Sequence, residues 1–138
     1  MTLANNTETQ DIAMTLIAYS GEGRTLAFNA LDAMHRDAFS ESKMLLKQSS
    51  EALGKAHDVQ TQLLVAEANG QQVSIDILLI HAQDHFMTSL LANELIAEML
   101  KMSQKFERMS IYESNQRVIS LCGRYVNQHL NEKVTAVS

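Results

Sequence analysis

The chain has 138 residues, a mass of 15.4 kDa and a formal net charge of −5, which fits one domain of ordinary size. This acidic balance argues against a nucleic-acid partner, because phosphate binding depends on basic surfaces. With no proline and a single cysteine, Cys122, the sequence favours long helices and excludes a disulfide framework.

The first predicted helix runs from about Thr9 to Arg36. Its apolar residues recur every three or four positions, which is helical spacing. Gly21 and Gly23 lie inside it, and each costs about 1 kcal/mol relative to alanine in a helix interior. They mark either a break in the helix or a close contact with another helix. Because the periodicity passes through them in phase, we predict one continuous helix.

The next helices follow after short links. Asp37 is the predicted cap of a second helix that continues to about Ala68 and ends at Asn69–Gly70. A third helix is expected from about Ser74 to past Leu100, and a fourth, shorter one from Tyr112 to Leu130. Short links place consecutive helices antiparallel. The predicted fold class is therefore all-α: an antiparallel three-helix bundle with an extra C-terminal helix.

The third helix is apolar on nearly every face between Ile75 and Leu100. A helix that is apolar all round has to be buried all round, and a three-helix monomer leaves part of each helix facing water. We therefore expect a homo-oligomer in which this helix lies near the symmetry axis.

One carboxylate interrupts an apolar stripe of this helix. Asp84 shares the stripe of Ile80, Met87, Leu91 and Leu95. A lone buried charge is prohibitive, so the aspartate must be paired, protonated or bound to a metal. If three or more copies met at an axis, their Asp84 carboxylates would meet as well. Oxygen ligands of like charge suit Mg²⁺ or Ca²⁺.

His81 and His85 lie one turn apart on the same helix face. Three interpretations remain open: a structural pair, a zinc site, or a nucleophilic imidazole that carries a covalent intermediate. Catalytic zinc of the HExxH type is excluded, since Ala82 occupies the position of the general-base glutamate. The absence of Lys and Arg from Ala56 to Leu100 favours a phosphoryl relay, because no nearby arginine would hold the phosphate tightly.

Five stretches carry a resemblance to a known family. His81–Ser89 and its continuation Leu95–Glu98 resemble the signature of the lactose/cellobiose-type enzyme IIA of the bacterial sugar phosphotransferase system, which includes the diacetylchitobiose type. Ala18–Arg24 resembles the first-helix block of that family, and Ala56–Thr61 with Glu67–Gly70 resembles the second. The resemblance spans roughly residues 9–105.

The resemblance implies a homotrimer of three-helix subunits that works as a phosphoryl carrier. By that likeness His81 accepts a phosphoryl group from the phosphocarrier HPr and passes it to a cysteine of the cognate IIB component. IIB then phosphorylates a β-linked disaccharide that enters through the membrane component IIC. Asp84 is expected to face the trimer axis and to help hold a divalent cation, which we expect to be Mg²⁺.

Gln83 and His85 are assigned as phosphate-side helpers on helical geometry alone. Gln83 points about 200° away from His81 at 100° per residue, so it reaches a group on His81 only from another subunit. No apolar run is long enough to cross a bilayer, and the N-terminus lacks the basic stretch of a signal peptide. A cytoplasmic location is therefore expected.

The family pattern ends near Lys105, so we divide the chain into an enzyme IIA domain at 1–105 and a C-terminal extension at 106–138. In one interpretation the extension packs on the outer surface of the bundle. In the other it covers the docking face for the phosphoryl donor or acceptor, or it recruits another protein. Two other functions stay open: a helical metal-binding protein using His81, Asp84 and His85, and a regulatory adaptor that works through its tail. The sequence does not distinguish lactose, cellobiose and chitobiose as the sugar.

Overall fold

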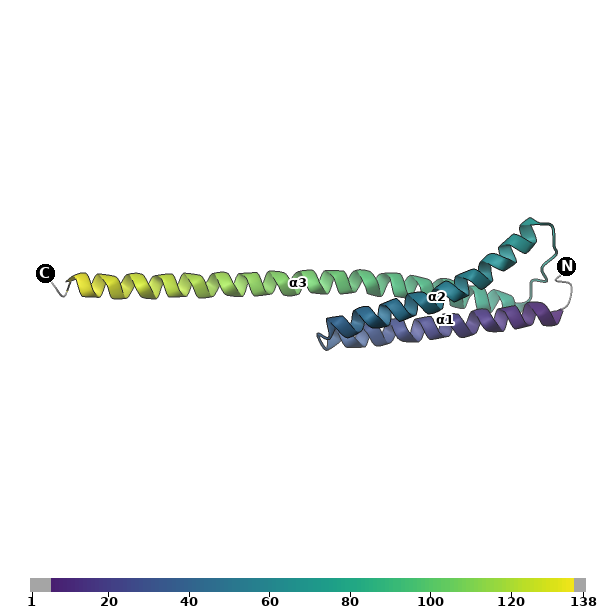
Figure 1. Cartoon of the computed structure of the whole chain (residues 1–138), viewed down its shortest axis with the longest axis horizontal. Helices are drawn as coiled ribbons and strands as arrows, with labels where there is room; N and C mark the ends of the chain where they lie inside the picture. The colour runs from purple at the N-terminus through teal and green to yellow at the C-terminus, as the bar shows by residue number, and fades with distance from the viewer. Residues whose placement is uncertain (1–5, 136–138) are drawn as a thin grey trace. The chain divides into compact units, whose positions relative to one another are not determined.

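The structure, a computed structural model, describes residues 6–135, with side chains from residue 8 to residue 128. This range consists of the helices α1 (Asn6–His35), α2 (Phe39–Ala68) and α3 (Ile77–Thr135), and it contains no strand (Figure 1). The predicted all-α class is confirmed. None of the described helices is apolar enough over a sufficient length to cross a membrane.

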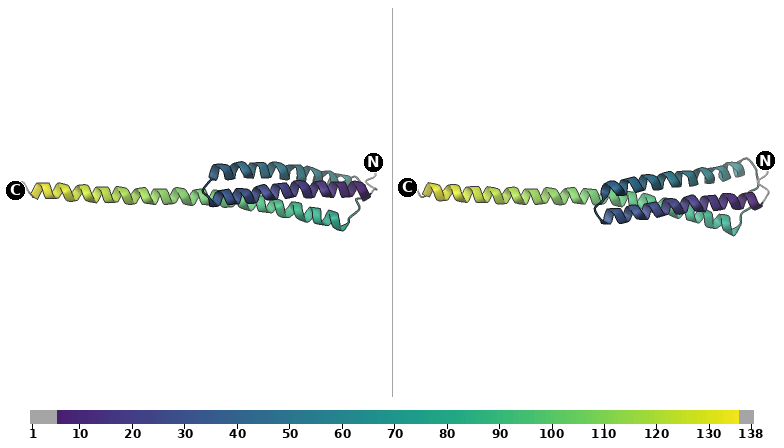
Figure 2. Two further views of the ribbon diagram at one scale, coloured as in Figure 1. Left: turned by 90° about the horizontal axis from the view of Figure 1, so that it is seen from below. Right: turned by 60° about the horizontal axis from the view of Figure 1, so that its bottom comes forward.

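The chain divides into two compact units between Lys101 and Met102. We call them the three-helix unit and the C-terminal unit and describe each by itself. In the three-helix unit, α1, α2 and the first part of α3 lie side by side (Figure 2). Only three residues, Arg36 to Ala38, separate α1 from α2, so these two helices run in opposite directions.

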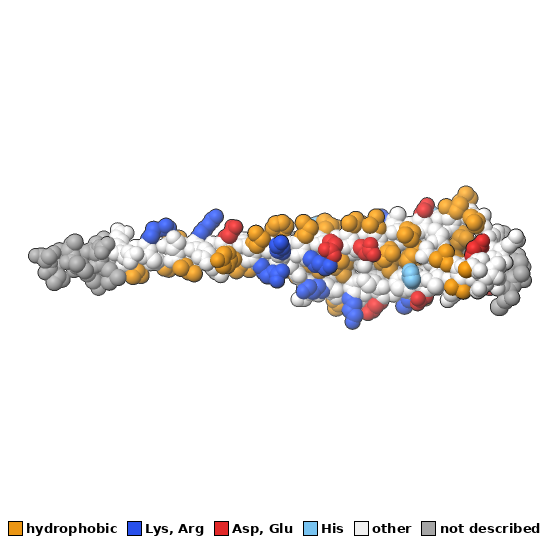
Figure 3. All heavy atoms as spheres, turned by 90° about the horizontal axis from the view of Figure 1, so that it is seen from above, with side chains coloured by type: hydrophobic (Ala, Val, Ile, Leu, Met, Phe, Trp, Pro, Cys, Tyr) orange, Lys and Arg blue, Asp and Glu red, His pale blue; other side chains and the backbone are white. Residues whose placement is uncertain are grey.

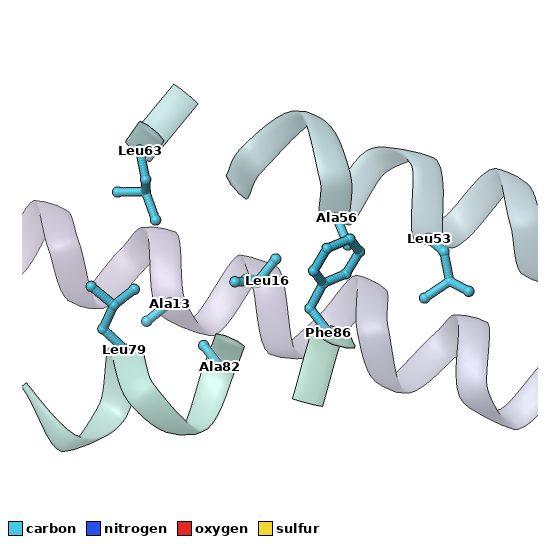
Figure 4. Close-up of a cluster of buried hydrophobic side chains, with 8 residues drawn as sticks. All are labelled: Ala13, Leu16, Leu53, Ala56, Leu63, Leu79, Ala82 and Phe86. Atoms are coloured by element: carbon cyan, nitrogen blue, oxygen red, sulfur yellow. The ribbon is translucent and has the colours of Figure 1, made fainter. Parts of the chain in front are cut away.

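The three helices share a core of aliphatic and small residues. One buried cluster (Figure 4) takes side chains from all three helices: Ala13, Leu16, Leu53, Ala56, Leu63, Leu79, Ala82 and Phe86. A second cluster lies further along the same helices and consists of Ala27, Ala30, Met34, Leu46, Ile96 and Leu100. The many alanines allow the helix backbones to come close together, and Phe86, which is 1% exposed, is the largest fully buried side chain of the first cluster.

The two glycines of α1 have different roles, although both lie inside one continuous helix, as predicted. Nothing lies within 4 Å of a Cβ built on Gly21. A Cβ on Gly23 would stand 2.6 Å from Leu53 Cγ and 3.3 Å from the carbonyl oxygen of Ser49. The buried Ser49 hydroxyl also donates a hydrogen bond of 2.7 Å to the carbonyl oxygen of Gly23. Gly23 therefore marks the close helix contact.

The prediction that Asp37 caps α2 is wrong. Asp37 has a φ of +58° and lies in the turn that ends α1. There the Asp37 N–H donates to the Met34 carbonyl at 3.0 Å, and the Ala38 N–H donates to the Ala33 carbonyl at 2.9 Å, which is the Schellman pattern. Ala38 takes the N-cap position of α2 without a side-chain hydrogen bond.

The end of α2 and the start of α3 illustrate one confirmed and one failed boundary. Gly70 has a φ of +79°, and the Gln71 N–H donates to the Ala66 carbonyl at 3.0 Å. The predicted stop at Asn69–Gly70 is therefore confirmed. The predicted start of the third helix at Ser74 is too early, because Asp76 accepts a 2.8 Å hydrogen bond from the Leu79 N–H and so caps a helix that begins at Ile77.

The predicted separate fourth helix is also wrong, because α3 continues through Tyr112 without interruption to Thr135. The sequence between Leu100 and Tyr112 holds no glycine or proline, and its Lys, Met, Gln, Glu and Arg residues are strong helix formers. Nothing there stops a helix that has already started. Every described side chain of the C-terminal unit from Lys105 to Gln128 is exposed.

The close contact at Gly23 can be tested by substitution, with Gly21 as the control. Gly23→Ala should lower the free energy of unfolding by about 1–3 kcal/mol, because the new methyl group overlaps Leu53. Gly21→Ala should raise it by about 1 kcal/mol, since its Cβ meets nothing and alanine is the better helix former. Urea denaturation followed by circular dichroism measures both. Equal effects of the two substitutions would contradict the assigned contact.

Candidate phosphoryl-transfer site

The two histidines meet on the outer surface of α3. Because they are four residues apart on one helix, their rings lie next to each other, one turn apart. The ring centroids of His81 and His85 are 4.9 Å apart, and the ring planes meet at 71°, edge to face. The two imidazoles are therefore in direct edge-to-face contact.

Burial distinguishes the two rings. Ala82 and Phe86 point into the core at 0% and 1% exposure, which leaves His81 on the solvent side of the helix, where it is exposed. His85 is half-buried, and its Nδ1 atom is buried without a hydrogen-bond partner among the described residues. His81 is thus the ring that an incoming reactant can reach, and His85 is the ring that the fold holds in place.

Gln83 lies on a different side of α3 from the histidines. Its Oε1 atom accepts a hydrogen bond from Nε2 of Gln60 on α2, and its side chain is half-buried. Among the described residues, Gln83 therefore bonds to α2 and not to either histidine. No signal in the sequence singled out Gln60 as a site residue, because the pairing depends on how α2 packs against α3.

Asp84 lies on the exposed apolar stripe of α3. Its side chain is exposed, and its carbonyl oxygen accepts a 2.7 Å hydrogen bond from the Thr88 hydroxyl. The stripe itself consists of Ile80, Met87, Leu91, Leu95 and Met99, which are 46–55% exposed. A single copy of the chain therefore leaves a row of large apolar side chains, with one carboxylate among them, facing water.

The side chains of a single copy do not build a metal centre. Within the described residues, no three His, Cys, Asp or Glu side chains come close enough to hold an ion. The zinc cluster of His81, Asp84 and His85 that a metal-binding function would need is therefore absent from one copy. A carboxylate such as Asp84 is a suitable ligand for a hard cation, but more than one copy would have to contribute oxygens.

A second polar group of α3 faces α2. Asn93, which is 8% exposed, donates a 3.2 Å hydrogen bond from Nδ2 to the hydroxyl of Ser50 on α2. It lies at the base of a surface groove between α2 and α3, whose walls include His57 and Phe86. The His57 and Phe86 rings are 6.2 Å apart. Neither His81 nor His85 lines this groove, and the hydrogen bond between Asn93 and Ser50 joins α3 to α2.

Comparison with known proteins identifies the family of this chain. Residues 11–104 match the family described as the lactose/cellobiose-specific IIA subunit of the phosphotransferase system. The N,N'-diacetylchitobiose-specific EIIA component of Escherichia coli is 40% identical over 100 residues, which cover 72% of this chain and 86% of that protein. The lactose-specific EIIA component of Staphylococcus epidermidis is 34% identical over 101 residues, covering 73% of this chain and 97% of that protein.

Solved structures of IIA proteins also resemble this chain. PtcA from S. mutans superposes with a TM-score of 0.72 at 36% identity, covering 72% of this chain and 98% of that one. The IIA subunit in the solution structure of the IIA(chitobiose)–HPr complex superposes with a TM-score of 0.63 at 37% identity, covering 72% and 96%. This chain belongs to the lactose/cellobiose-specific IIA family of the phosphotransferase system, whose members act as phosphotransfer intermediates.

Proposed function

We propose that this protein is a phosphoryl carrier that accepts a phosphoryl group from phospho-HPr on His81 and passes it to the cysteine of a cognate IIB component. The observation that carries the proposal is an exposed His81 whose ring is oriented by a half-buried His85 at 4.9 Å. The E. coli chitobiose relative is seen in complex with HPr, which supports HPr as the donor. The final acceptor would be a β-linked disaccharide such as chitobiose, cellobiose or lactose, entering through a membrane IIC component.

In the first transfer, a lone pair on an imidazole nitrogen of His81 attacks phosphorus. The new N–P bond forms while the bond between phosphorus and the donor breaks, and the donor leaves with that electron pair. In the second transfer, the IIB thiolate forms an S–P bond, the N–P bond breaks and His81 is restored. Such transfers depend on positioning and electrostatics, and the exposed position of His81 allows two different partners to approach in turn.

We propose that Gln83 assists the transfer from a neighbouring copy. Its Oε1 atom is occupied by Gln60, so its Nε2 group keeps both N–H donors free. Since Gln83 lies on a different side of α3 from His81, these donors would reach the phosphoryl group on the His81 of another subunit. We propose His85 as the second helper, acting through the orientation of the His81 ring.

The exposed stripe of α3 supports a homotrimer around this helix. Leu91 and Leu95 are 54% and 55% exposed in one copy, and packing three such stripes together would remove them from water. The three Asp84 carboxylates would then converge, and a divalent cation such as Mg²⁺ would offset their repulsion. The ion would have a structural role in the assembly. We place the carrier in the cytoplasm, where its phosphoryl donor would have to be.

The first test is phosphorylation itself. The protein is mixed with phosphoenolpyruvate, enzyme I and HPr and is analysed by intact mass before and after an acid wash. The wild type should gain one acid-labile phosphoryl group, His81→Gln none, and His85→Gln one group at a reduced rate. A wild type that stays unmodified in an active donor mixture would contradict the carrier function and favour the regulatory adaptor.

The contribution of Gln83 from a neighbouring copy can be tested with mixed trimers. Gln83→Ala alone should lower the phosphorylation rate about tenfold to hundredfold, by loss of a donor to the transferring group. Co-refolding it with His81→Gln should restore part of the rate, since trimers then combine an intact His81 with an intact Gln83 from different copies. A mixture no faster than the sum of its separate components would contradict assistance between subunits.

The variant Asp84→Asn tests both the trimeric assembly and the bound divalent cation. Sedimentation should show a trimer for both wild type and variant. EDTA should lower the melting temperature of the wild type, because unscreened carboxylates repel, and should leave Asp84→Asn unchanged. A wild-type monomer would refute the trimer, whereas a wild-type trimer insensitive to EDTA would refute only the cation.

A further inference from the structure

The C-terminal unit carries a row of mainly apolar residues that follow one another at steps of three or four positions. This spacing is typical of helices that wind around one another. The row consists of Met102, Phe106, Met109, Tyr112, Asn115, Ile119, Cys122 and Val126, and all eight are exposed in a single copy. We call these eight residues the seam.

The period of the seam is that of a coiled coil. The seam takes seven steps over 24 positions, which is about 3.4 residues a step, close to the 3.5 of a left-handed coiled coil. Three consecutive steps of three residues, from Phe106 to Asn115, correspond to a stammer, which a coiled coil takes up by local overwinding. Asn115 is the polar member of the seam, and a polar residue at such a contact fixes the register at a cost in stability.

The charged side chains of the last two heptads lie away from the seam. They are Glu113, Arg117 and Arg124, and none shares the seam side of the helix at 100° per residue. In Figure 3, basic side chains lie along one edge of the C-terminal unit beside its grey end, and hydrophobic side chains lie along the opposite edge. Identical helices that meet along this part of the seam would therefore not bring like charges together.

Apolar residues also flank the seam on one side. Ile111 and Val118 are 54% and 58% exposed, and each lies one turn before a seam residue on the same face of the helix. They widen the apolar face from two positions in seven to three. A face of two positions suits a pair of helices, whereas a face of three suits a helix that packs in a bundle against more than one neighbour. In a three-stranded coiled coil each helix has two neighbours.

The proposed trimer supplies these neighbours, and the inference rests on it. α3 passes from the stripe of Leu91 and Leu95 into the C-terminal unit as one helix. Three-fold symmetry would give the three copies of the seam the same direction along the axis, and the assembly would hold them at a high effective concentration. Other copies of this chain are therefore favoured over a partner that has to arrive from solution.

We propose that residues 102–126 of three copies form a parallel three-stranded coiled coil along the seam. The coiled coil adds a second contact between the copies, besides the stripe around Asp84. It holds together the subunits between which Gln83 would assist His81. The C-terminal extension thus stabilises the assembly in which the proposed transfer site is complete.

Cys122 tests the proposal at one position of the seam, because a parallel coiled coil brings its copies within reach of a disulfide. The oxidant diamide accepts the two protons and two electrons that a pair of thiols gives up. It should link about two thirds of the chains as dimers, one pair per trimer. The yield should not fall on dilution, since both thiols belong to one assembly. The control variant Ser120→Cys, Cys122→Ser carries its thiol away from the seam and should link at least about tenfold more slowly.

A matched pair of substitutions tests the same contact without oxidation. Ile119 and Leu121 are 63% and 57% exposed in a single copy, but only Ile119 belongs to the seam. Ile119→Gln should raise the concentration at which half of the trimers dissociate at least about tenfold, because it removes an apolar contact between copies. Leu121→Gln should raise it less than about threefold. Sedimentation over a dilution series measures both, and circular dichroism checks that both variants remain helical.

The outcomes separate the coiled coil from the trimer and from the carrier function. A wild-type trimer whose Cys122 thiols link no faster than the control thiols, or equal effects of the two substitutions, would overturn the coiled coil alone. Linked species larger than a trimer that disappear on dilution would also overturn it, because the tails of separate assemblies would then be the occupants. A wild-type monomer would overturn the coiled coil and the trimer together. Phosphorylation of His81 reports on the carrier function independently of these results.

Discussion

The apolar side chains of α3 lie on two opposite sides of the helix, and α1 and α2 cover only one of them. Ala82 and Phe86 on one side are covered by α1 and α2, at 0% and 1% exposure. Met87 and Leu91 on the other side are more than half exposed in a single copy. One chain has no further helix in its three-helix unit to cover that second side. The same constraint places His81 at the margin between the covered and uncovered sides, where a ring can be oriented and still be reached.

Close approach of α1 and α2 is the condition for this arrangement. It depends on small residues: Gly23 faces Leu53, and the Ser49 hydroxyl bonds to the Gly23 carbonyl oxygen. A hydroxyl that is fully buried is tolerated here because it has an acceptor. Packing at this distance also sets the position of α2 relative to α3, which in turn lets Gln60 reach Gln83.

The C-terminal unit differs from the family domain in the burial of its side chains. Residues 11–104 match the IIA family, whereas every described side chain from Lys105 to Gln128 is exposed. Helical propensity carries α3 across this boundary, since nothing in the sequence stops it. The family domain and the C-terminal unit are therefore joined by one helix without a linker.

Local sequence determined the first two helices, the pairing of His81 with His85 and the stop at Asn69–Gly70, because these depend on spacing along one helix and on the backbone freedom of glycine. It failed at Asp37 and Ser74, where the turn geometry of neighbouring residues decides which residue caps a helix. Only the tertiary structure decided that Gly23 and not Gly21 is a contact, that Gln83 bonds to Gln60, and that His81 is more exposed than His85. These outcomes depend on which faces of separate helices meet, and that is set by packing between residues far apart in the chain.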